Sequence, residues 1–275
     1  MKQFFYRYES DILFSTPVSA HSWLLRCMPK EEPFQRAERA FVRVSVVRED
    51  GEELSLPVCH GRDAFGNAVQ WGYVAGAHCR FSILSEGVMR QTPYRICGTA
   101  HDMFLEHTAL TRPDADMERF AGQVPLRAAE ESCEGSLPRG KVLERALSLC
   151  DAVYRHMSYV PGATTVNTTA GQAFALGQGV CQDYAHILLS LLRCSGIPAR
   201  YACGYLAGEG AGHAWVEFFD QGVWRGLDPA NNRLLSCGCI KVAHGRDSAD
   251  CPVNRGVFTG RAAQQNTLAI KVEEV

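Results

Sequence analysis

The segment from Cys181 to Asp228 constrains the fold more than any other part of the chain. Apolar residues recur there at helical spacing: Tyr184, Ile187, Leu188, Leu191 and Leu192. Gly196 and Pro198 follow this stripe and supply a stop signal. The pattern predicts a helix that begins near Cys181.

Apolar segments of strand length come directly after this helix, at residues 201–206, 214–219 and 223–227. Asp220 to Gly222 joins the last two as a short hairpin loop. An earlier stripe, from Val142 to Met157, also has helical spacing. Helices followed by a run of strands are typical of an α+β domain, in contrast to alternating βαβ units.

The first part of the chain, up to about residue 105, is rich in strand-forming residues. Its alternating or β-branched runs are Phe41–Val47, Ala68–Tyr73 and Arg80–Leu84, and turn signals separate them at Asp50-Gly51 and Gly66-Asn67. These runs predict a small antiparallel β-sandwich at the N-terminus.

A change of composition suggests where the two parts meet. Residues 110–138 carry three prolines and no sustained periodicity, as expected of a linker. We therefore expect a β-rich domain at 1–110, a linker at 111–138 and an α+β domain at 139–275.

Charge and length exclude several classes of protein. The 275 residues include 28 Lys and Arg against 30 Asp and Glu, with no run of like charges, so nucleic acid and anionic membrane are not expected partners. The longest apolar stretches fall far short of a membrane span, and the N-terminus lacks the apolar core of a signal peptide. The expectation is a cytoplasmic protein of undetermined oligomeric state.

The chain holds 12 cysteines, most of which we expect to be free thiols in such a compartment. One group has some character of a zinc site: Cys237, Cys239, His244 and Cys251. Its spacing departs from paired zinc ligands, and Gly238 and Pro252 are more simply turn residues beside buried thiols. No metal and no cofactor are expected.

Cys181 is the one thiol with a sequence-based reason to be reactive. It follows Gly177-Gln178-Gly179-Val180, a flexible approach that places it in the first turn of the predicted helix. Unpaired backbone N–H groups and the helix dipole favour an anion there. A buried structural cysteine is the alternative reading.

A nucleophilic thiol needs a base, and His213 is the better of two candidates. His186 is nearer in sequence, but five residues along a helix turn it about 140° from the face of Cys181. His213 opens the strand His213-Ala214-Trp215-Val216-Glu217, in which His213, Trp215 and Glu217 share one face. We expect that face to line a cleft.

Asp228 ends the strand that returns beside His213, so its carboxylate could orient the imidazole. An Asp-Pro turn that simply terminates the strand is the alternative.

Four sequence segments together resemble the bacterial transglutaminase-like superfamily, which has a papain-like cysteine-catalytic fold. They are GQGVCQDYAHILLSLLRCSGIPARYACGYL, HAWVEF, WRGLDPANN and VAHGRDSADCPVNRGVFTG, within about residues 140–260. The β-rich N-terminal part resembles the domain that often precedes such cores. The resemblance implies a catalytic domain at 139–275, with Cys181 as nucleophile, His213 as general base and acid, and Asp228 as its orienter.

The expected activity is a cysteine-dependent hydrolase of peptide or amide bonds that acts through a thioester acyl-enzyme. The backbone N–H of Cys181 is the expected oxyanion donor, and Gln172, Gln178 and Gln182 remain open as side-chain donors. A transglutaminase-type acyl transferase is one alternative, and a non-catalytic peptide-binding module on the same fold is another. Calcium is not implied, because no stretch has the pattern of a calcium loop.

Overall fold

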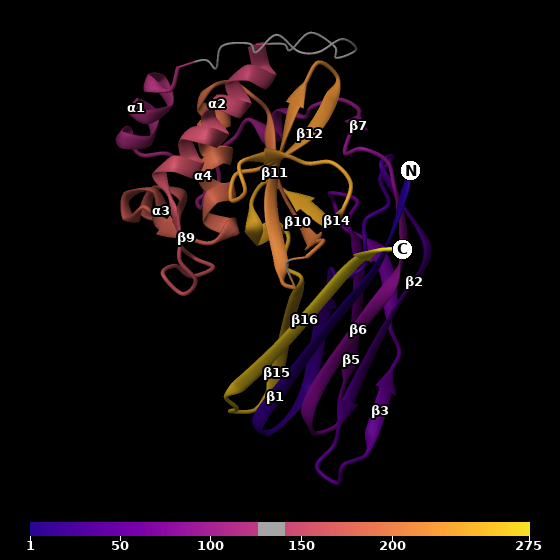
Figure 1. Cartoon of the computed structure of the whole chain (residues 1–275). Coiled ribbons are helices and arrows are strands. Elements are labelled where there is room, and N and C mark those ends of the chain that lie inside the picture. Colours follow the sequence, from indigo (N-terminus) through magenta and orange to yellow (C-terminus); the bar gives the residue numbers. More distant parts are fainter. Residues whose placement is uncertain (126–140, 209) are drawn as a thin grey trace.

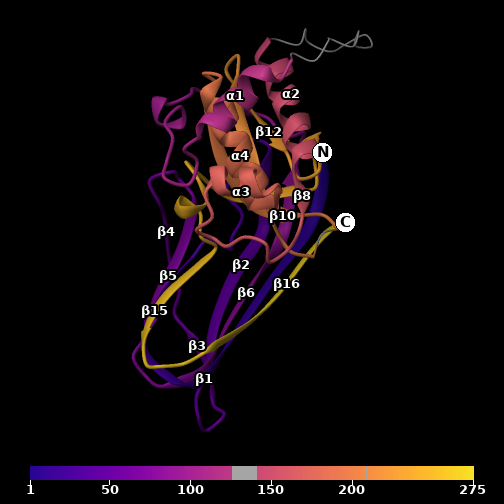
Figure 2. The ribbon, with the colours of Figure 1, turned by 90° about the vertical axis from the view of Figure 1, so that its left-hand side faces the viewer.

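The computed structural model describes residues 1–125, 141–208 and 210–275, and it has two lobes (Figure 1). One lobe, called here the strand lobe, contains β1–β6 with β15 and β16. The other, called the helical lobe, contains α1–α4 and β7–β14. Both chain termini lie near the junction of the lobes, and the view turned by 90° shows the same stacking of one lobe on the other (Figure 2).

The strand lobe is an antiparallel sheet with the order β3-β2-β6-β1-β5-β4, in which β15 and β16 also pair with β1. The bounds are β1 (Lys2–Leu25), β2 (Gln35–Val47), β3 (Glu53–Leu56), β4 (Cys59–Arg62), β5 (Ala68–Val74), β6 (His78–Gln91), β15 (Asn254–Thr259) and β16 (Gln264–Glu274). The first part of β1 pairs with β6 and β16, and its last part pairs with β5 and β15. One long strand therefore joins two antiparallel ladders, in the β-rich region that the sequence predicts.

The C-terminal strands depart from the expected division of the chain. β16 pairs with β1 along its whole length, with Tyr8 opposite Ile270, so residues 254–274 lie in the strand lobe although the sequence assigns them to the second domain. Only Ile270 and Val272 of β16 are buried, so the strand has too little apolar alternation to reveal its partner. Conversely, β7 (Ile96–Cys97) lies in the helical lobe, where it pairs with β12.

The helical lobe has a second antiparallel sheet with the order β13-β12-β11-β10-β14. Its strands are β10 (Ala199–Leu206), β11 (Gly212–Asp220), β12 (Val223–Asp228), β13 (Arg233–Leu234) and β14 (Cys239–Gly245), and a short parallel pair is formed by β8 (Ser158–Tyr159) and β9 (Gln178–Gly179). The hairpin of β11 and β12 turns at the predicted position, whereas β14 was not predicted.

The helices are α1 (Ala115–Gln123), α2 (Lys141–His156), α3 (Ala170–Leu176) and α4 (Cys181–Cys194), with 3-10 turns η1 (Asp102–Phe104) and η2 (Ser248–Asp250). The predicted helices at 142–157 and near Cys181 correspond to α2 and α4. α1 lies within the segment expected to be an irregular linker, where the Asp114 side chain caps it by accepting from the N–H of Met117. Residues 126–138 of that segment fall outside the described residues.

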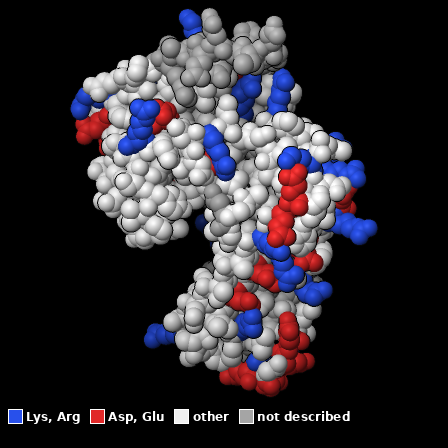
Figure 3. All heavy atoms as spheres, in the orientation of Figure 1, with Lys and Arg blue, Asp and Glu red and all other residues white. Residues whose placement is uncertain are grey.

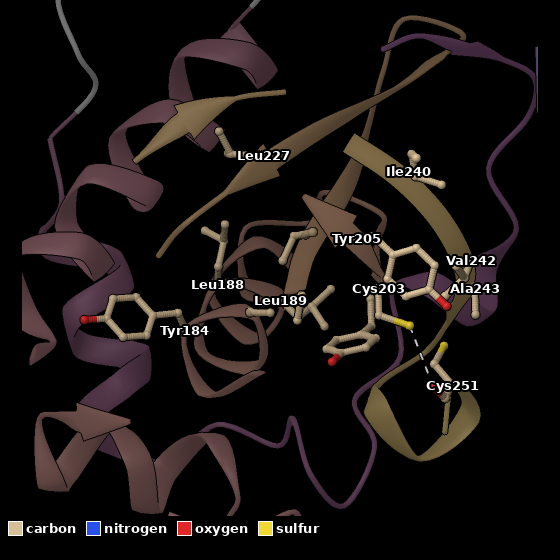
Figure 4. Packing of buried hydrophobic residues seen from close by; sticks show 14 of the residues in the cluster. Tyr184, Leu188, Leu189, Cys203, Tyr205, Leu227, Ile240, Val242, Ala243 and Cys251 are labelled. Atoms are coloured by element: carbon tan, nitrogen blue, oxygen red, sulfur yellow. Dashed lines mark hydrogen bonds between the residues drawn. The ribbon is translucent and has the colours of Figure 1, made fainter. Parts of the chain in front are cut away.

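α4 is buried along most of its length, and it packs against β10, β11 and the other helices. Every residue from Asp183 to Arg193 is buried, not just the predicted apolar stripe. Figure 4 shows Leu188 and Leu189 of α4 in the same cluster as Tyr205 of β10 and Ile240 of β14. Full burial of a leucine stabilises a fold by about 1.5–3 kcal/mol, so this packing fixes the position of the helix firmly.

A cluster of buried charged side chains joins strands of the second sheet to the segment that precedes β2. Glu217 of β11 is fully buried and pairs with Arg200 of β10 and with Lys241 of β14, whose Nζ is 2.8 Å from Glu217 Oε1. Lys241 Nζ also lies 3.0 Å from Oε1 of Glu32, which precedes β2. Burial raises the pKa of Glu217, but Arg200 and Lys241 outweigh it and lower that pKa to about 2.

We predict that Glu217→Gln lowers the free energy of unfolding by about 3–5 kcal/mol at neutral pH, because two buried cations lose their counter-charge. Glu273→Gln, which breaks the exposed pair with Lys271, should cost less than about 1 kcal/mol. Urea denaturation of the two variants and the wild type measures both values. Because the pKa of Glu217 is depressed, its stabilisation is full above the unfolded value and should fade only as the pH falls towards 2. Equal losses for the two variants would contradict the account.

Among the described residues, no helix combines the length and the apolarity needed to cross a bilayer. Cytoplasmic localisation stays a prediction.

Candidate active site

Cys181 is the first residue of α4, and a carboxylate in the same first turn holds the backbone beside it. Oδ2 of Asp183 accepts hydrogen bonds from the backbone N–H of Val180 at 2.8 Å and from Oγ1 of Thr164 at 2.6 Å. An acidic side chain in the first turn also suits the positive end of the helix dipole. The thiol is therefore carried on a fixed helix terminus.

The glycines before Cys181 each have a geometric role, so the approach is more constrained than the flexible one expected from the sequence. Gly177 ends α3 in the left-handed conformation, with φ of 64°. A Cβ on Gly179 would lie 2.5 Å from Oδ2 of Asp183, so the backbone can approach that carboxylate only where the side chain is absent. β9, which contains Gly179, is further held by parallel pairing with β8.

His213 lies at the start of β11, and the hairpin register brings Asp228 towards it. β11 and β12 pair antiparallel, with Val216 opposite Leu227. Continuing this register places Asp228 opposite Trp215, two residues from His213 on the same face. Diagonal neighbours at such positions are within reach of aromatic and long side chains.

The contact between His213 and Asp228 is direct. Nε2 of His213 is 2.9 Å from Oδ2 of Asp228, whose side chain is fully buried. The same carboxylate accepts from Nδ2 of Asn231 at 2.9 Å and from the backbone N–H of Ala230 at 3.2 Å. Asp228 therefore forms the turn that follows β12 and contacts the imidazole as well, so the two readings of this residue are compatible.

The imidazole shares its surroundings with Cys181. Both side chains line one cavity, and Cys181 is among the groups that shift the pKa of His213. Burial disfavours the imidazolium, but the hydrogen bonds and charges of Asp228 and Cys181 outweigh it and raise the pKa of His213 to about 10. Burial also acts to raise the pKa of Asp228, but the hydrogen bond to His213 outweighs burial, so the pKa of Asp228 lies below its usual value.

His186 has different surroundings. It is fully buried within α4, and its Nε2 accepts a hydrogen bond from the backbone N–H of Ser248 at 3.2 Å. Burial lowers the pKa of His186 to about 4, so its ring is neutral at ordinary pH. This side chain packs and supports η2, while His213 is the histidine that lines the cavity of the thiol.

Only one end of the His213 face of β11 meets open space. Trp215 is fully buried in a small core cluster with Trp224, and Glu217 is buried in the charge cluster. His213 thus lines the cavity, whereas residues of β7 and of the segment before it cover the rest of this face. Tyr94 lies there and hydrogen-bonds both Trp215 Nε1, at 3.0 Å, and Glu217.

A cavity of about 590 Å³ contains Cys181 and His213, and both lobes build its walls. The helical lobe contributes Tyr201, Gly204 and Ala214, among others. The strand lobe contributes Tyr8, Asn254, Arg255, Leu268 and Ile270. Sequence reasoning missed these strand-lobe residues, because no local pattern indicates that β15 and β16 return to the site.

The three glutamines considered as oxyanion donors occupy different places. Gln172 caps α3, where its Oε1 accepts from the N–H of Thr169 at 2.9 Å. Gln178 is exposed on β9, and Gln182 lines the cavity beside Cys181. Gln182 is therefore the one of the three that shares the cavity with the thiol.

Comparison with known proteins identifies the family of this region. Residues 130–229, which contain Cys181, His213 and Asp228, match the family model of the Transglutaminase-like superfamily. This region is similar to the transglutaminase-like superfamily. A crystal structure of a candidate cysteine protease from Cytophaga hutchinsonii has the same fold, with a TM-score of 0.75 and 20% identity over 100% of this chain and 92% of that one.

Two relatives by sequence extend the comparison. An uncharacterised protein of Mycobacterium tuberculosis is 28% identical over 222 residues, which are 72% of this chain and 71% of that protein. A protein-glutamine gamma-glutamyltransferase of Pseudomonas aeruginosa is 34% identical over 103 residues, which are 30% of this chain and 15% of that protein. The first similarity covers most of the chain, whereas the second covers less than a third of it.

The thiols considered as zinc ligands lie in separate surroundings. Cys239 is buried in the small core cluster of Trp215. Cys251 accepts a hydrogen bond at its carbonyl oxygen from the thiol of Cys203, at 3.7 Å (Figure 4). Within residues 1–125, 141–208 and 210–275, no three His, Cys, Asp or Glu side chains converge as metal ligands.

We predict that the imidazole of His213 titrates near pH 10 in the wild type and at a clearly lower pH in Cys181→Ala, because that variant lacks the thiol that favours the imidazolium. NMR titration of histidine Cε1–H signals, assigned with a His213→Gln variant, gives both values. The ring of His186 should stay neutral down to about pH 4, so its signal should not shift above that pH in either protein. A pKa of His213 near the usual value of 6.5, or one that is the same in the wild type and in Cys181→Ala, would refute the pairing.

Proposed function

We propose that the protein is a cysteine-dependent amide or peptide hydrolase in which Cys181, His213 and Asp228 act as a catalytic triad. One observation carries the proposal: His213 lines the same open cavity as Cys181, its pKa is raised partly by that thiol, and its Nε2 lies 2.9 Å from Asp228. This is the arrangement of nucleophile, base and orienting group that acyl transfer requires. The proposed substrate is a peptide or an amide, and no metal or cofactor takes part in the proposed steps.

In the first step, Sγ of the Cys181 thiolate forms a bond to the carbonyl carbon of the amide. The carbonyl oxygen becomes an oxyanion, which the backbone N–H of Cys181 at the start of α4 stabilises. The imidazolium of His213 gives its Nδ1 proton to the amide nitrogen, the C–N bond breaks and an amine leaves. The products of this step are a thioester on Cys181 and a neutral imidazole.

In the second step, Nδ1 of His213 takes a proton from a water molecule that attacks the thioester carbon. The C–S bond then breaks, a carboxylic acid leaves, and the thiolate–imidazolium pair is restored. Asp228 stays a deprotonated carboxylate throughout and stabilises the imidazolium through its hydrogen bond with Nε2.

Cys181→Ala should abolish turnover of amide substrates and leave the fold intact, because the substitution removes a small side chain and no cap. Cys194→Ala is the matched control, since Cys194 is the exposed thiol at the other end of α4. Release of amine from a set of peptide amides measures turnover, and circular dichroism checks the fold. Activity retained in folded Cys181→Ala would eliminate the proposed nucleophile.

Asp228→Asn should lower kcat/KM by about 10²- to 10⁴-fold, because the imidazolium loses its counter-charge and its orienting acceptor.

The pH profile of kcat/KM should be bell-shaped, and its basic limb, which reports loss of the imidazolium proton, should lie near pH 10 in the wild type. In Asp228→Asn that limb should move to lower pH. Asp220→Asn changes another buried carboxylate of the same hairpin, bonded to Arg225 at 3.0 Å, and should leave the limb in place. An unchanged limb in Asp228→Asn would reduce the site to a dyad.

An acyl transferase is the second candidate, favoured by the relative named as a protein-glutamine gamma-glutamyltransferase. In that reaction an amine replaces water in the second step. Adding increasing concentrations of a primary amine and quantifying the acid and the amide product distinguishes the two. Exclusive formation of acid would support hydrolysis, and exclusive formation of the amide would support transfer.

A non-catalytic peptide-binding module is the remaining alternative. Rapid alkylation of Cys181 by iodoacetamide near neutral pH would argue against it, because unperturbed thiols react slowly there.

A further inference from the structure

The cavity around Cys181 has an unequal distribution of charge. Among the described residues that line it, His213 and Arg255 are the ones that can carry a positive charge, and none is an aspartate or a glutamate. In the proposed resting state the imidazolium of His213 is balanced by the thiolate of Cys181. Arg255 therefore adds a positive charge that no lining side chain of the described part of the chain offsets.

Arg255 is held in place by its backbone, while its side chain is left exposed. It belongs to β15, where its backbone pairs with Leu24 of β1. In the part of the chain that the structure describes, no carboxylate comes within ion-pair distance of its guanidinium. Two other arginines, by contrast, form ion pairs: Arg26 lies 2.9 Å from Asp63, and Arg246 lies 2.9 Å from Asp250.

The surroundings of Arg255 suit a small anion that is part of a larger molecule. Asn254, Asn167 and Gln182 also line the cavity, and their side-chain amides can donate hydrogen bonds to an oxygen acceptor. Leu268 and Ile270 add apolar surface to the same cavity. Figure 3 shows that the surface bordering the notch between the lobes in this view is mostly uncharged, so a charged group entering there has few competing partners.

We infer that Arg255 is a specificity-determining residue that binds a carboxylate of the substrate, close to the amide bond that Cys181 attacks. The guanidinium presents parallel N–H groups that match a carboxylate in a bidentate manner. This inference rests on the proposed amide hydrolysis. Two sources of the carboxylate share this chemistry: an acidic side chain flanking the scissile bond, and the free C-terminus of a short peptide.

Matched fluorogenic peptide amides test the inference. One set differs only by Glu or Gln on either side of the scissile bond, and a second set ends in a free carboxylate or in a carboxamide. The wild type should cleave the carboxylate member of one set with a kcat/KM several-fold above that of its neutral partner. The set that shows the preference identifies the source of the carboxylate.

Variants then assign the preference to one residue. Arg255→Gln should remove the preference, and Arg255→Glu should reverse it. Arg261→Gln is the matched control, because Arg261 is exposed between β15 and β16 and is not among the cavity-lining residues. Equal cleavage of charged and neutral members by the wild type, or a preference that survives in Arg255→Gln, would overturn the inference.

A second measurement separates this inference from the proposed function, since it needs no turnover. Site-resolved mass spectrometry gives the alkylation rates of Cys181 by iodoacetate, which is an anion, and by iodoacetamide, which is neutral. The ratio of the two rates should fall several-fold in Arg255→Gln and should not change in Arg261→Gln. A ratio that falls in a protein with no amidase activity would refute the proposed function and retain the anion subsite. An unchanged ratio would overturn the subsite.

Discussion

Burial of α4 is the constraint on which the rest of the structure depends. The helix is enclosed by the second sheet and by α1, α2 and α3, so neither its axis nor its rotation can change without loss of core packing. Asp183 then fixes the backbone just before the helix, and Gly179 makes room for that carboxylate. As a result, packing of the helix places Cys181 in the cavity that His213 of β11 also lines.

The strand lobe contributes to the site as well as to the fold. β16 runs along β1 and brings Leu268 and Ile270 to the cavity, while β15 brings Arg255. The buried cluster of Glu217 and Lys241 links the second sheet to Glu32 before β2, which holds the lobes in a fixed relation. We therefore regard the cavity as a product of both lobes: one supplies the reacting groups, and the other supplies much of the surface that a substrate would contact.

The parts of the fold that sequence could predict are those with a local signal. The amphipathic stripe of α4 with its glycine and proline stop, and the hairpin of β11 and β12 with its tight loop, are written in adjacent residues. The partner of β16 has no such local signal, because the strand pairs with β1, more than 250 residues away. The pairing of His213 with Asp228 could be anticipated from the hairpin, whereas Tyr8 and Arg255 at the cavity could not, since only tertiary structure brings β1 and β15 there.

The central claim is that Cys181 carries the acyl group during the reaction, and trapping that species tests it most directly. A peptide amide that serves as a substrate is mixed with the enzyme, and the reaction is quenched with acid within the first turnover. The enzyme is then digested and its peptides are analysed by mass spectrometry. The account predicts an added acyl mass on the peptide that contains Cys181, removable by hydroxylamine as expected of a thioester, and released amine in equal amount. Amine released in the first turnover with no acyl group on Cys181 would contradict it.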